Sequence, residues 1–453
     1  MKHDKKKITR GTVEKVPFKD FILTPLTKSK LQIICAILIF GFTLSVFYHF
    51  LLINYLGYDG YPFLTFLFKP WDSFMDFFNI YKQTASLDPY KEFANYFPLT
   101  FIFVYLLTLF PPAVAFFIFS LSFIAFFLFF IYTYLPRMNV FNRILITFIF
   151  SFMSYPFLFT LDRGNLEAWV FISIALFLHF YLKGKDALSI LFLAIAISLK
   201  LYPAILVILF LFNRKYLNVI YSFSAALFLS LVSAGFLQGG VKATLHGIAA
   251  GLSAFSGTMT FGPQGLQKNL SLYAPLRLFF DYITIQVDKF SFQNDQLFYN
   301  AYYFFALILF GVIAFFLYRY KISLWKRVSI LVLSFIVLPQ ISFDYKLISV
   351  FIPLMLFICS DEVSKYNTQY SIIFGLLLIP KDYYFIVDEV GIAIIFNPLL
   401  IMLMICLICI ESVPANKKTM RENLVKIPSQ NLKVNRDRRK NKKIQNSKFI
   451  RDT

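Results

Sequence analysis

The chain has 453 residues, of which 58% are hydrophobic, 20% aromatic and only 15% charged. Soluble globular proteins carry about 25% charged residues, and apolar runs of about 20 residues recur along most of this chain, so the soluble, fibrous and disordered classes are excluded. The net charge is +20, and most of it lies in two tails: residues 1–30 hold nine Lys/Arg against three Asp/Glu, and residues 413–453 hold thirteen against three.

Basic tails beside membrane helices follow the positive-inside rule and attract anionic lipids. We therefore expect both tails to be cytoplasmic, the C-terminal one to be disordered, and their partners to be anionic membrane lipids. No basic patch is interleaved with base-stacking aromatic residues, so no nucleic-acid partner is expected. Residues 31–412 between the tails are predicted to form one transmembrane domain.

The predicted elements are almost all membrane helices. Pro111-Pro112 breaks the long apolar run 98–135 into a half-helix and a full helix. The predicted helices outside the broken segments are, in chain order, 31–53, 113–135, 144–161, 166–182, 217–237, 298–318, 369–380 and 391–410. Large external loops are expected at 54–97 and 238–297. Together with the broken segments, the chain is predicted to be an all-α polytopic membrane protein with about 11–13 membrane segments.

Two of these segments are predicted to be broken hairpins. Residues 187–213 are apolar, but basic residues flank both ends, which predicts two short helices that meet at Lys200 to Pro203. Residues 328–360 form a second hairpin with Pro339 to Lys346 at its tip. The cysteines Cys35, Cys359, Cys406 and Cys409 all lie in apolar runs, so the chain has no disulfide framework.

A narrow polar stripe runs through the first external loop. At 100° per residue, Asp72, Asp76, Asn79 and Gln83 lie on one face of a helix, with Phe77 among the aromatic residues opposite. The pattern predicts an amphipathic helix on the external membrane surface. The stripe is either the solvated face of that helix or a site in which a carboxylate acts as a general base on an acceptor hydroxyl.

Charged residues within apolar segments are the other candidates, since each costs about 2.5–3.5 kcal/mol at the centre of a membrane helix. Lys200 either reaches the membrane surface or binds a lipid-linked phosphate. Arg163 is a second candidate cation for that phosphate, and Glu167 is interpreted as a helix cap. Asp344 and Lys346 either neutralise each other or line a substrate site. Cys406 and Cys409 have the spacing of a redox or metal motif, but they lie in an apolar helix-length run without polar partners and are interpreted as small hydrophobic residues. No His/Asp/Glu cluster has zinc spacing, so no cofactor is required, although an acidic pair could hold a metal ion.

Four stretches of the chain resemble one known family. They are Asp76 to Asn79 with Asp88-Pro89-Tyr90 and Tyr96-Phe97-Pro98-Leu99; Arg163-Gly164-Asn165 through Ser198 to Pro203; Asn269-Leu270-Ser271 with Arg277; and Pro339 to Tyr345. Their order and spacing over residues 70–360 resemble glycosyltransferase family 87 of the GT-C superfamily, whose best-known members are polyprenyl-phosphate-mannose-dependent mannosyltransferases. Phe97 replaces the first proline of a Tyr-Pro-Pro motif, and Asp344 to Lys346 stand where mannosyltransferases place histidine, which leaves the sugar and the acceptor open.

The resemblance implies a GT-C-like bundle with an active site on the external face of a plasma membrane, which we expect to be bacterial. It implies an inverting transfer of a mannose-like hexose from a polyprenyl-phosphate sugar to a lipid-linked or cell-envelope glycan, with Asp76 as the general base and Asp72 as its alternate. Candidate phosphate-binding residues are Lys200, Arg163, Arg277 and Lys268. Candidate substrate-binding residues are Asn79, Tyr90, Asn165, Tyr202, Asn269, Asp344 and Lys346. The alternative is a transporter or flippase for a lipid-linked sugar, since broken helices with charged tips also occur in transporters.

Overall fold

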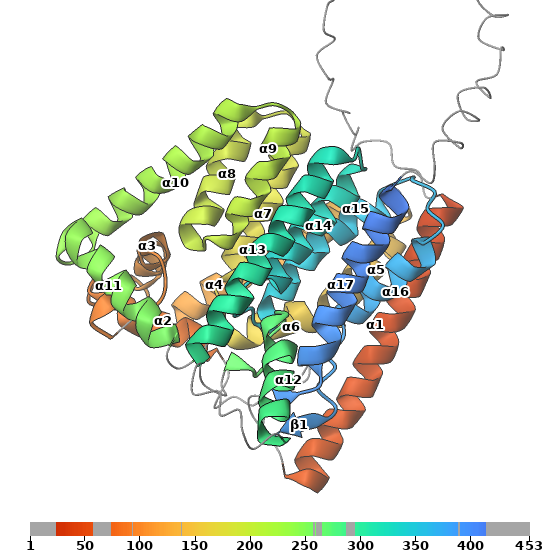
Figure 1. Ribbon diagram of the computed structural model, residues 1–453, viewed down its shortest axis with the longest axis horizontal. Helices are drawn as coiled ribbons and strands as arrows, with labels where there is room; N and C mark the ends of the chain where they lie inside the picture. Colours follow the sequence, from red (N-terminus) through yellow and green to blue (C-terminus); the bar gives the residue numbers. More distant parts are fainter. Residues whose placement is uncertain are drawn as a thin grey trace, which may run out of the picture. The chain divides into compact units, whose positions relative to one another are not determined.

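The computed structural model describes residues 24–57, 74–92, 94–136, 138–256, 259, 265–286, 295–387 and 390–413 (Figure 1). Most of each tail and Asp72 lie outside these residues. The chain divides into two compact units, residues 1–408 and 409–453, and the contacts below belong to the first.

The described elements are helices, with one short hairpin of strands. The first half of the chain contains α1 (Pro25–Leu51), its π-helical extension η1 (Leu52–Leu56), α2 (Met75–Thr84), the 3₁₀ turn η2 (Pro89–Glu92), α3 (Pro98–Leu107), α4 (Pro112–Tyr134), α5 (Val140–Phe152), α6 (Tyr155–Arg163), α7 (Glu167–Leu182), α8 (Asp186–Leu199), η3 (Tyr202–Val207), α9 (Ile208–Phe212) and α10 (Tyr216–Phe236). The second half contains α11 (Gly240–Phe255), α12 (Tyr273–Gln286), α13 (Asp295–Arg319), α14 (Leu324–Val337), η6 (Asp344–Val350), α15 (Phe351–Ile358), α16 (Asn367–Leu377), the antiparallel strands β1 (Phe385–Val387) and β2 (Val390–Gly391), and α17 (Ala393–Ser412).

The prediction of an all-α membrane protein is confirmed. Five described helices are long and apolar enough to span a membrane, namely α1 with η1, α4, α10, α13 and α17, and a sixth span results if the bent pair α5 and α6 is counted as one. The other apolar helices are shorter, among them α3, α7, α8 and residues 202–212. Of the 11–13 segments expected, five or six therefore have full spanning length.

Proline and polar residues produce the breaks that the sequence predicts. Pro112 begins α4 directly after α3, as expected for proline in the first turn of a helix. The hairpin 187–213 is broken at Lys200, whose backbone is extended, and 328–360 is broken between α14 and α15, where the 3₁₀ segment η6 lies. These breaks place polar residues between apolar helices.

Three boundaries differ from prediction. The helix expected at 144–161 is two helices, α5 and α6, bent by 55°, because Ser154 precedes a new start with Pro156 in its first turn. The first helix begins at Pro25 rather than Leu31, since the side chain of Thr24 caps it. The external loop expected at 238–297 contains α11 and α12.

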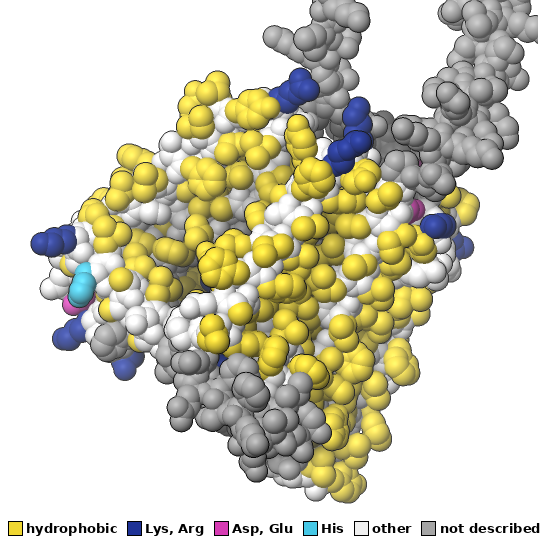
Figure 2. Space-filling model, in the orientation of Figure 1, with side chains coloured by type: hydrophobic (Ala, Val, Ile, Leu, Met, Phe, Trp, Pro, Cys, Tyr) yellow, Lys and Arg dark blue, Asp and Glu magenta, His cyan; other side chains and the backbone are white. Residues whose placement is uncertain are grey.

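Two glycines lie where helices approach closely, and many large apolar residues are exposed on the surface. Gly41 of α1 faces Ile379, and Gly375 of α16 faces Ile37, each without room for a Cβ, which is the close approach that small residues allow in membranes. Figure 2 shows one face covered largely by hydrophobic side chains. Among the exposed apolar residues is Phe304 of α13. A membrane can cover such a face without the cost of exposing it to water.

Lys30 joins the beginning of α1 to the end of α15. Its buried Nζ donates hydrogen bonds to the carbonyl oxygens of Phe357 at 2.9 Å and Ser360 at 2.8 Å, and it lies 4.3 Å from the centroid of the Phe357 ring. The last carbonyls of a helix lack partners within the helix, and a cation there also interacts favourably with the helix dipole. Lys30 therefore supplies a cap between segments more than 300 residues apart in the chain.

Candidate active site

Asp76 lies in the first turn of α2, and both of its carboxylate oxygens are held by the turn between α6 and α7. Arg163 donates to Oδ1 at 3.0 Å, and Asn165 donates from Nδ2 to Oδ2 at 2.6 Å. The Asp76 side chain is 22% exposed, so it remains accessible. The arrangement fixes the carboxylate with a charge-assisted pair on one side and an amide on the other.

Helix α2 packs closely against the turn between α6 and α7. The amide of Phe74 donates to the carbonyl of Asp162 at 2.6 Å. Gly164 has a left-handed φ of +59°, and a Cβ at this position would lie 2.8 Å from the Cβ of Phe77. Phe77 is buried and its ring packs against Phe116 of α4. The amphipathic helix expected from the polar stripe is present, although it begins at Met75.

A polar pocket of about 320 Å³ opens beside Asp76. It is lined by Asp76, Asn79, Ile80, Gln83, Ala94, Asn95, Tyr96, Ala254 and Phe255. The spacing of Asp76, Asn79 and Gln83 puts them on one face of α2, as predicted. Ala254 and Phe255 of the lining come from α11, a helix that the sequence analysis did not predict.

Tyr90 supports this pocket from outside its lining. Its hydroxyl donates to the carbonyl of Tyr96 at 2.9 Å. Gly247 of α11 approaches so closely that a Cβ there would lie 2.4 Å from the Cβ of Tyr90. Burial raises the pKa of Tyr96 above its ordinary range, so this pocket residue remains a neutral phenol.

Glu167 is the centre of a second polar cluster, immediately after Asn165. Its side chain is fully buried, its Oε1 accepts from Lys200 Nζ at 2.7 Å, and its Oε2 accepts from the Tyr202 hydroxyl. Its backbone amide donates to Asn165 Oδ1 at 3.0 Å. Asn165 therefore contacts Asp76 with its amide nitrogen and the Glu167 backbone with its oxygen, which links the two clusters directly.

A second lysine adds positive charge to the Glu167 cluster. Lys346, from η6, is 8% exposed. Its Nζ lies 4.8 Å from the centroid of the Tyr202 ring and donates to the carbonyl of Ile341 at 3.3 Å. Lys200 Nζ lies 5.2 Å from the centroid of the Tyr345 ring. Burial lowers the pKa of Lys346 to about 8, although the charge of Glu167 opposes that shift. Lys200 thus contacts the Glu167 carboxylate directly and Lys346 lies near enough to interact with its charge, and two lysines with one carboxylate favour an additional anion.

Glu167 is the residue that sequence reasoning missed. Its position at the start of α7 indicates a helix cap. The sequence also shows that Glu167 is a charged residue two positions after Asn165 at the start of an apolar segment, which is the feature that could have indicated a role in the site. Its partners Lys200 and Tyr202 are 33 and 35 residues away. That pairing becomes visible only when the hairpin folds back beside α7.

Lys268 and Asp344 belong to a different buried cluster. Lys268 forms an ion pair with Asp382 at 2.5 Å, with side chains only 2% and 5% exposed. Asp344 accepts from the Tyr155 hydroxyl at 2.7 Å, and its amide donates to the carbonyl of Lys268 at 3.1 Å. Burial raises the pKa of Asp344, while the nearby Lys268 lowers it. Lys268, expected as a phosphate ligand, thus has a buried carboxylate as its partner.

Asn269 and Arg277, two further predicted site residues, make contacts with groups other than Asp76. Asn269 Nδ2 donates to the carbonyls of Gly265 and Gln340, and its Oδ1 accepts from the amides of Ser271 and Ser342. These four bonds use the full capacity of the amide group, so Asn269 joins two backbone segments. Arg277 of α12 donates to the Tyr273 hydroxyl at 3.4 Å and lies near Phe298 of α13.

Within the described ranges, no three His, Cys, Asp or Glu side chains come together as metal ligands. The two polar clusters contain lysine, arginine, tyrosine, amide and carboxylate groups. Comparison with known families supports an assignment. A family model described as glycosyltransferase family 87 matches residues 93–339, more than half of the chain.

The chain belongs to glycosyltransferase family 87. With its long apolar helices, it is a membrane glycosyltransferase. The matched region contains Asn165, Glu167 and Lys200, whereas Asp76 precedes it and Lys346 follows it. No curated protein and no solved structure matches the chain.

Proposed function

We propose that this glycosyltransferase moves a mannose-like hexose from a polyprenyl-phosphate sugar to a hydroxyl of a lipid-linked or cell-envelope glycan at the external membrane face, with inversion. One observation carries the proposal: the Asp76 carboxylate lines a polar pocket and is linked through Asn165 to the cationic cluster of Lys200 and Lys346. A base beside an anion-binding group is what transfer from a phosphate-linked sugar requires.

The proposed base is Asp76. A carboxylate has about four acceptor sites, and Arg163 and Asn165 each take one. An acceptor hydroxyl in the pocket donates to a remaining site and gives its proton to Asp76 as its oxygen attacks the anomeric carbon. Asn79 and Gln83, on the same face of α2, hold sugar hydroxyls. A single displacement of this kind inverts the anomeric centre.

The proposed leaving-group site is formed by Lys200 and Lys346. As the bond from the anomeric carbon to the phosphate oxygen breaks, negative charge grows on the polyprenyl phosphate, and fixed cations stabilise that charge. Lys200 donates one of its three N–H groups to Glu167, which leaves others for the phosphate. Glu167 is a positioning residue in this scheme: it holds Lys200 and Tyr202 in place. Arg163 orients the base.

The transporter alternative is less well supported. Family membership indicates transfer rather than transport. The acidic residue with an accessible pocket lies on the short amphipathic helix α2, which falls outside the candidate spanning helices. Transporters instead concentrate ionisable groups at the bilayer midplane, between paired repeats.

The deciding experiment is native mass spectrometry and a transfer assay on the purified Asp76→Asn protein. We expect a co-purifying polyprenyl-phosphate hexose to remain bound while the transfer rate falls about 10²–10⁴-fold, the usual contribution of a general base. Asp186→Asn, which removes a carboxylate that is paired with Lys215 at the start of α8, is the control and should retain activity.

Two results would contradict this proposal. If Asp76→Asn retains most of its activity, the base lies elsewhere and Asp72 becomes the candidate. If the wild-type protein binds only bulk phospholipid, even with polyprenyl-phosphate hexoses added, the donor class is wrong and transport regains support.

A further inference from the structure

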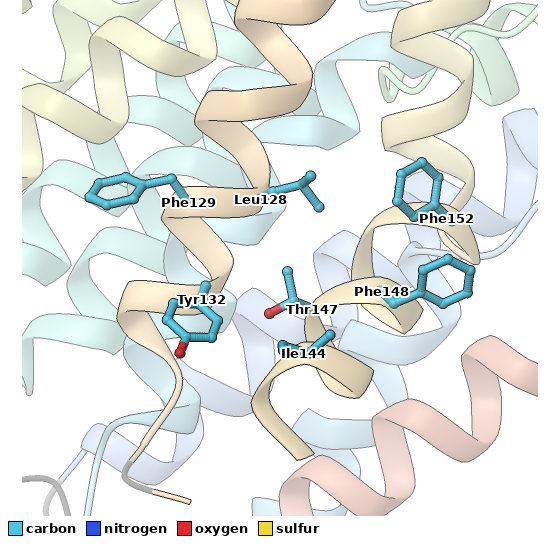
Figure 3. A pocket seen from close by; sticks show the side chains of 7 residues that line it. All are labelled: Leu128, Phe129, Tyr132, Ile144, Thr147, Phe148 and Phe152. Atoms are coloured by element: carbon cyan, nitrogen blue, oxygen red, sulfur yellow. The ribbon is translucent and has the colours of Figure 1, made fainter. Parts of the chain in front are cut away.

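An apolar groove lies between α4 and α5, on a different part of the bundle from the polar pocket. Its volume is about 400 Å³, and it is lined by Leu128, Phe129, Tyr132, Ile144, Thr147, Phe148 and Phe152. In Figure 3, Leu128 and Tyr132 of α4 face Ile144 and Thr147 of α5 across this gap. Phe129 is 65% exposed and Ile144 is 56% exposed. Because α4 is a candidate spanning helix, the groove opens on the outer surface of the bundle, where lipid would lie.

One cation, Arg143, lies next to the groove, because it precedes the lining residue Ile144 and contacts the lining residue Tyr132. The guanidinium of Arg143 stacks on the Tyr132 ring, 3.8 Å from its centroid, and donates to the Tyr132 carbonyl. Its Nε is buried and has no hydrogen-bond partner within the described residues. No described carboxylate forms an ion pair with Arg143. It also stands in the first turns of α5, where the helix dipole favours an anion.

We propose that this groove binds an anionic phospholipid, with one acyl chain between α4 and α5 and the phosphate at Arg143. An acyl chain gains little from leaving other lipids for an apolar groove, because both surroundings are equally apolar. Selectivity must therefore come from the charge of Arg143, whose planar guanidinium suits phosphate oxygens. This inference does not rest on the proposed reaction.

The polyprenyl-phosphate donor is a less suitable occupant of this groove. The beginning of α4 packs on α2, where Phe116 contacts Phe77 next to the proposed base. Tyr132 lies 16 positions beyond Phe116, about 24 Å along the helix at 1.5 Å per residue. A donor phosphate at Lys200 cannot also contact Arg143, so the phosphate at Arg143 belongs to a different lipid.

The test is native mass spectrometry of the purified full-length protein titrated with phosphatidylglycerol or phosphatidylcholine of identical acyl chains. The wild-type protein should bind one equivalent of phosphatidylglycerol in preference to phosphatidylcholine. Arg143→Gln should weaken phosphatidylglycerol binding about fivefold, the effect of one basic residue near an anionic lipid surface. Phosphatidylcholine binding should stay unchanged.

Arg319→Gln is the control, because Arg319 lies at the end of a candidate spanning helix and beside a tyrosine ring, at 5.8 Å from the centroid of the Tyr320 ring. It should keep the lipid preference. Ile144→Trp leaves the arginine in place and fills the groove from an exposed position, so it should lower the binding of both lipids even if Arg143→Gln folds poorly.

Three outcomes would overturn the inference. Equal losses in Arg143→Gln and Arg319→Gln would indicate diffuse surface charge. Unchanged binding in Ile144→Trp would place the lipid outside the groove. Displacement of phosphatidylglycerol by polyprenyl phosphate, with the same dependence on Arg143, would assign the groove to a prenyl lipid. Because Asp76→Asn leaves this groove untouched, its result decides the proposed reaction separately.

Discussion

Lys346 gives the proposed phosphate site a dependence on pH. Burial lowers its pKa to about 8, and a lysine is charged below its pKa and neutral above it. Donor binding should therefore weaken as the pH rises through 8, since a phosphodiester stays anionic across this range. Lys346→Arg, whose side chain remains charged, should abolish the alkaline loss of affinity.

The measurement is the affinity for a polyprenyl-phosphate hexose on both sides of pH 8, in the wild-type protein and in Lys346→Arg. An equal alkaline loss of affinity in the two proteins would show that Lys346 does not titrate against the phosphate.

Lys268 is expected to stabilise the fold rather than bind substrate. Its partner Asp382 is 5% exposed, and removing one member of a buried ion pair costs about 3–5 kcal/mol. Lys268→Met should therefore lower the thermal unfolding temperature, and adding Asp382→Asn should restore much of it. The asparagine keeps the side-chain oxygen that accepts from the Ala393 amide. Normal stability combined with lost donor binding would instead favour the phosphate role indicated by the sequence.

At the scale of elements, the packing of α2 against the turn between α6 and α7 should control activity, because it sets the position of Asp76. Gly164→Ala introduces a Cβ at 2.8 Å from that of Phe77, which pushes α2 and Asp76 away from Arg163. Gly184→Ala is the matched control: its φ is +66°, but nothing lies within 4 Å of the added Cβ. Both variants carry the left-handed backbone cost of about 1–2 kcal/mol.

Only Gly164→Ala should lose most of its transferase activity. The comparison is made as transfer rate per folded protein, and equal activities in the two alanine variants would show that the position of α2 does not matter.

Breaks between helices were predicted where a proline or a charged residue interrupts an apolar run, and they were missed where the run is continuous. Pro112 and Lys200 interrupt apolar runs, so both breaks were visible in the sequence. The bend before Pro156 lies within one continuous apolar run, and a proline in such a run also suits the first turn of a helix. The helix α11 was missed because a long segment between two spans was interpreted as loop.

At the scale of the whole molecule, sequence motifs predicted which residues belong to the site but not which distant residues they pair with. The short motif at residues 163–165 places Arg163 and Asn165 in the site, where both contact Asp76. The sequence contains nothing that pairs Lys268 with Asp382, 114 residues away, or Lys200 with Glu167. Such pairs depend on how helices fold back on each other, which local periodicity does not encode.

The cap formed by Lys30 has a consequence for biosynthesis. Its acceptors, the carbonyls of Phe357 and Ser360, lie 327 and 330 residues further along the chain. At about 5–20 residues per second, a ribosome needs roughly 15 seconds to one minute to supply them. During that interval the ammonium group must stay hydrated or bind a lipid headgroup. Helix α1 therefore cannot form these contacts until α15 has been synthesised, so its final docking waits for a segment more than 300 residues further along the chain.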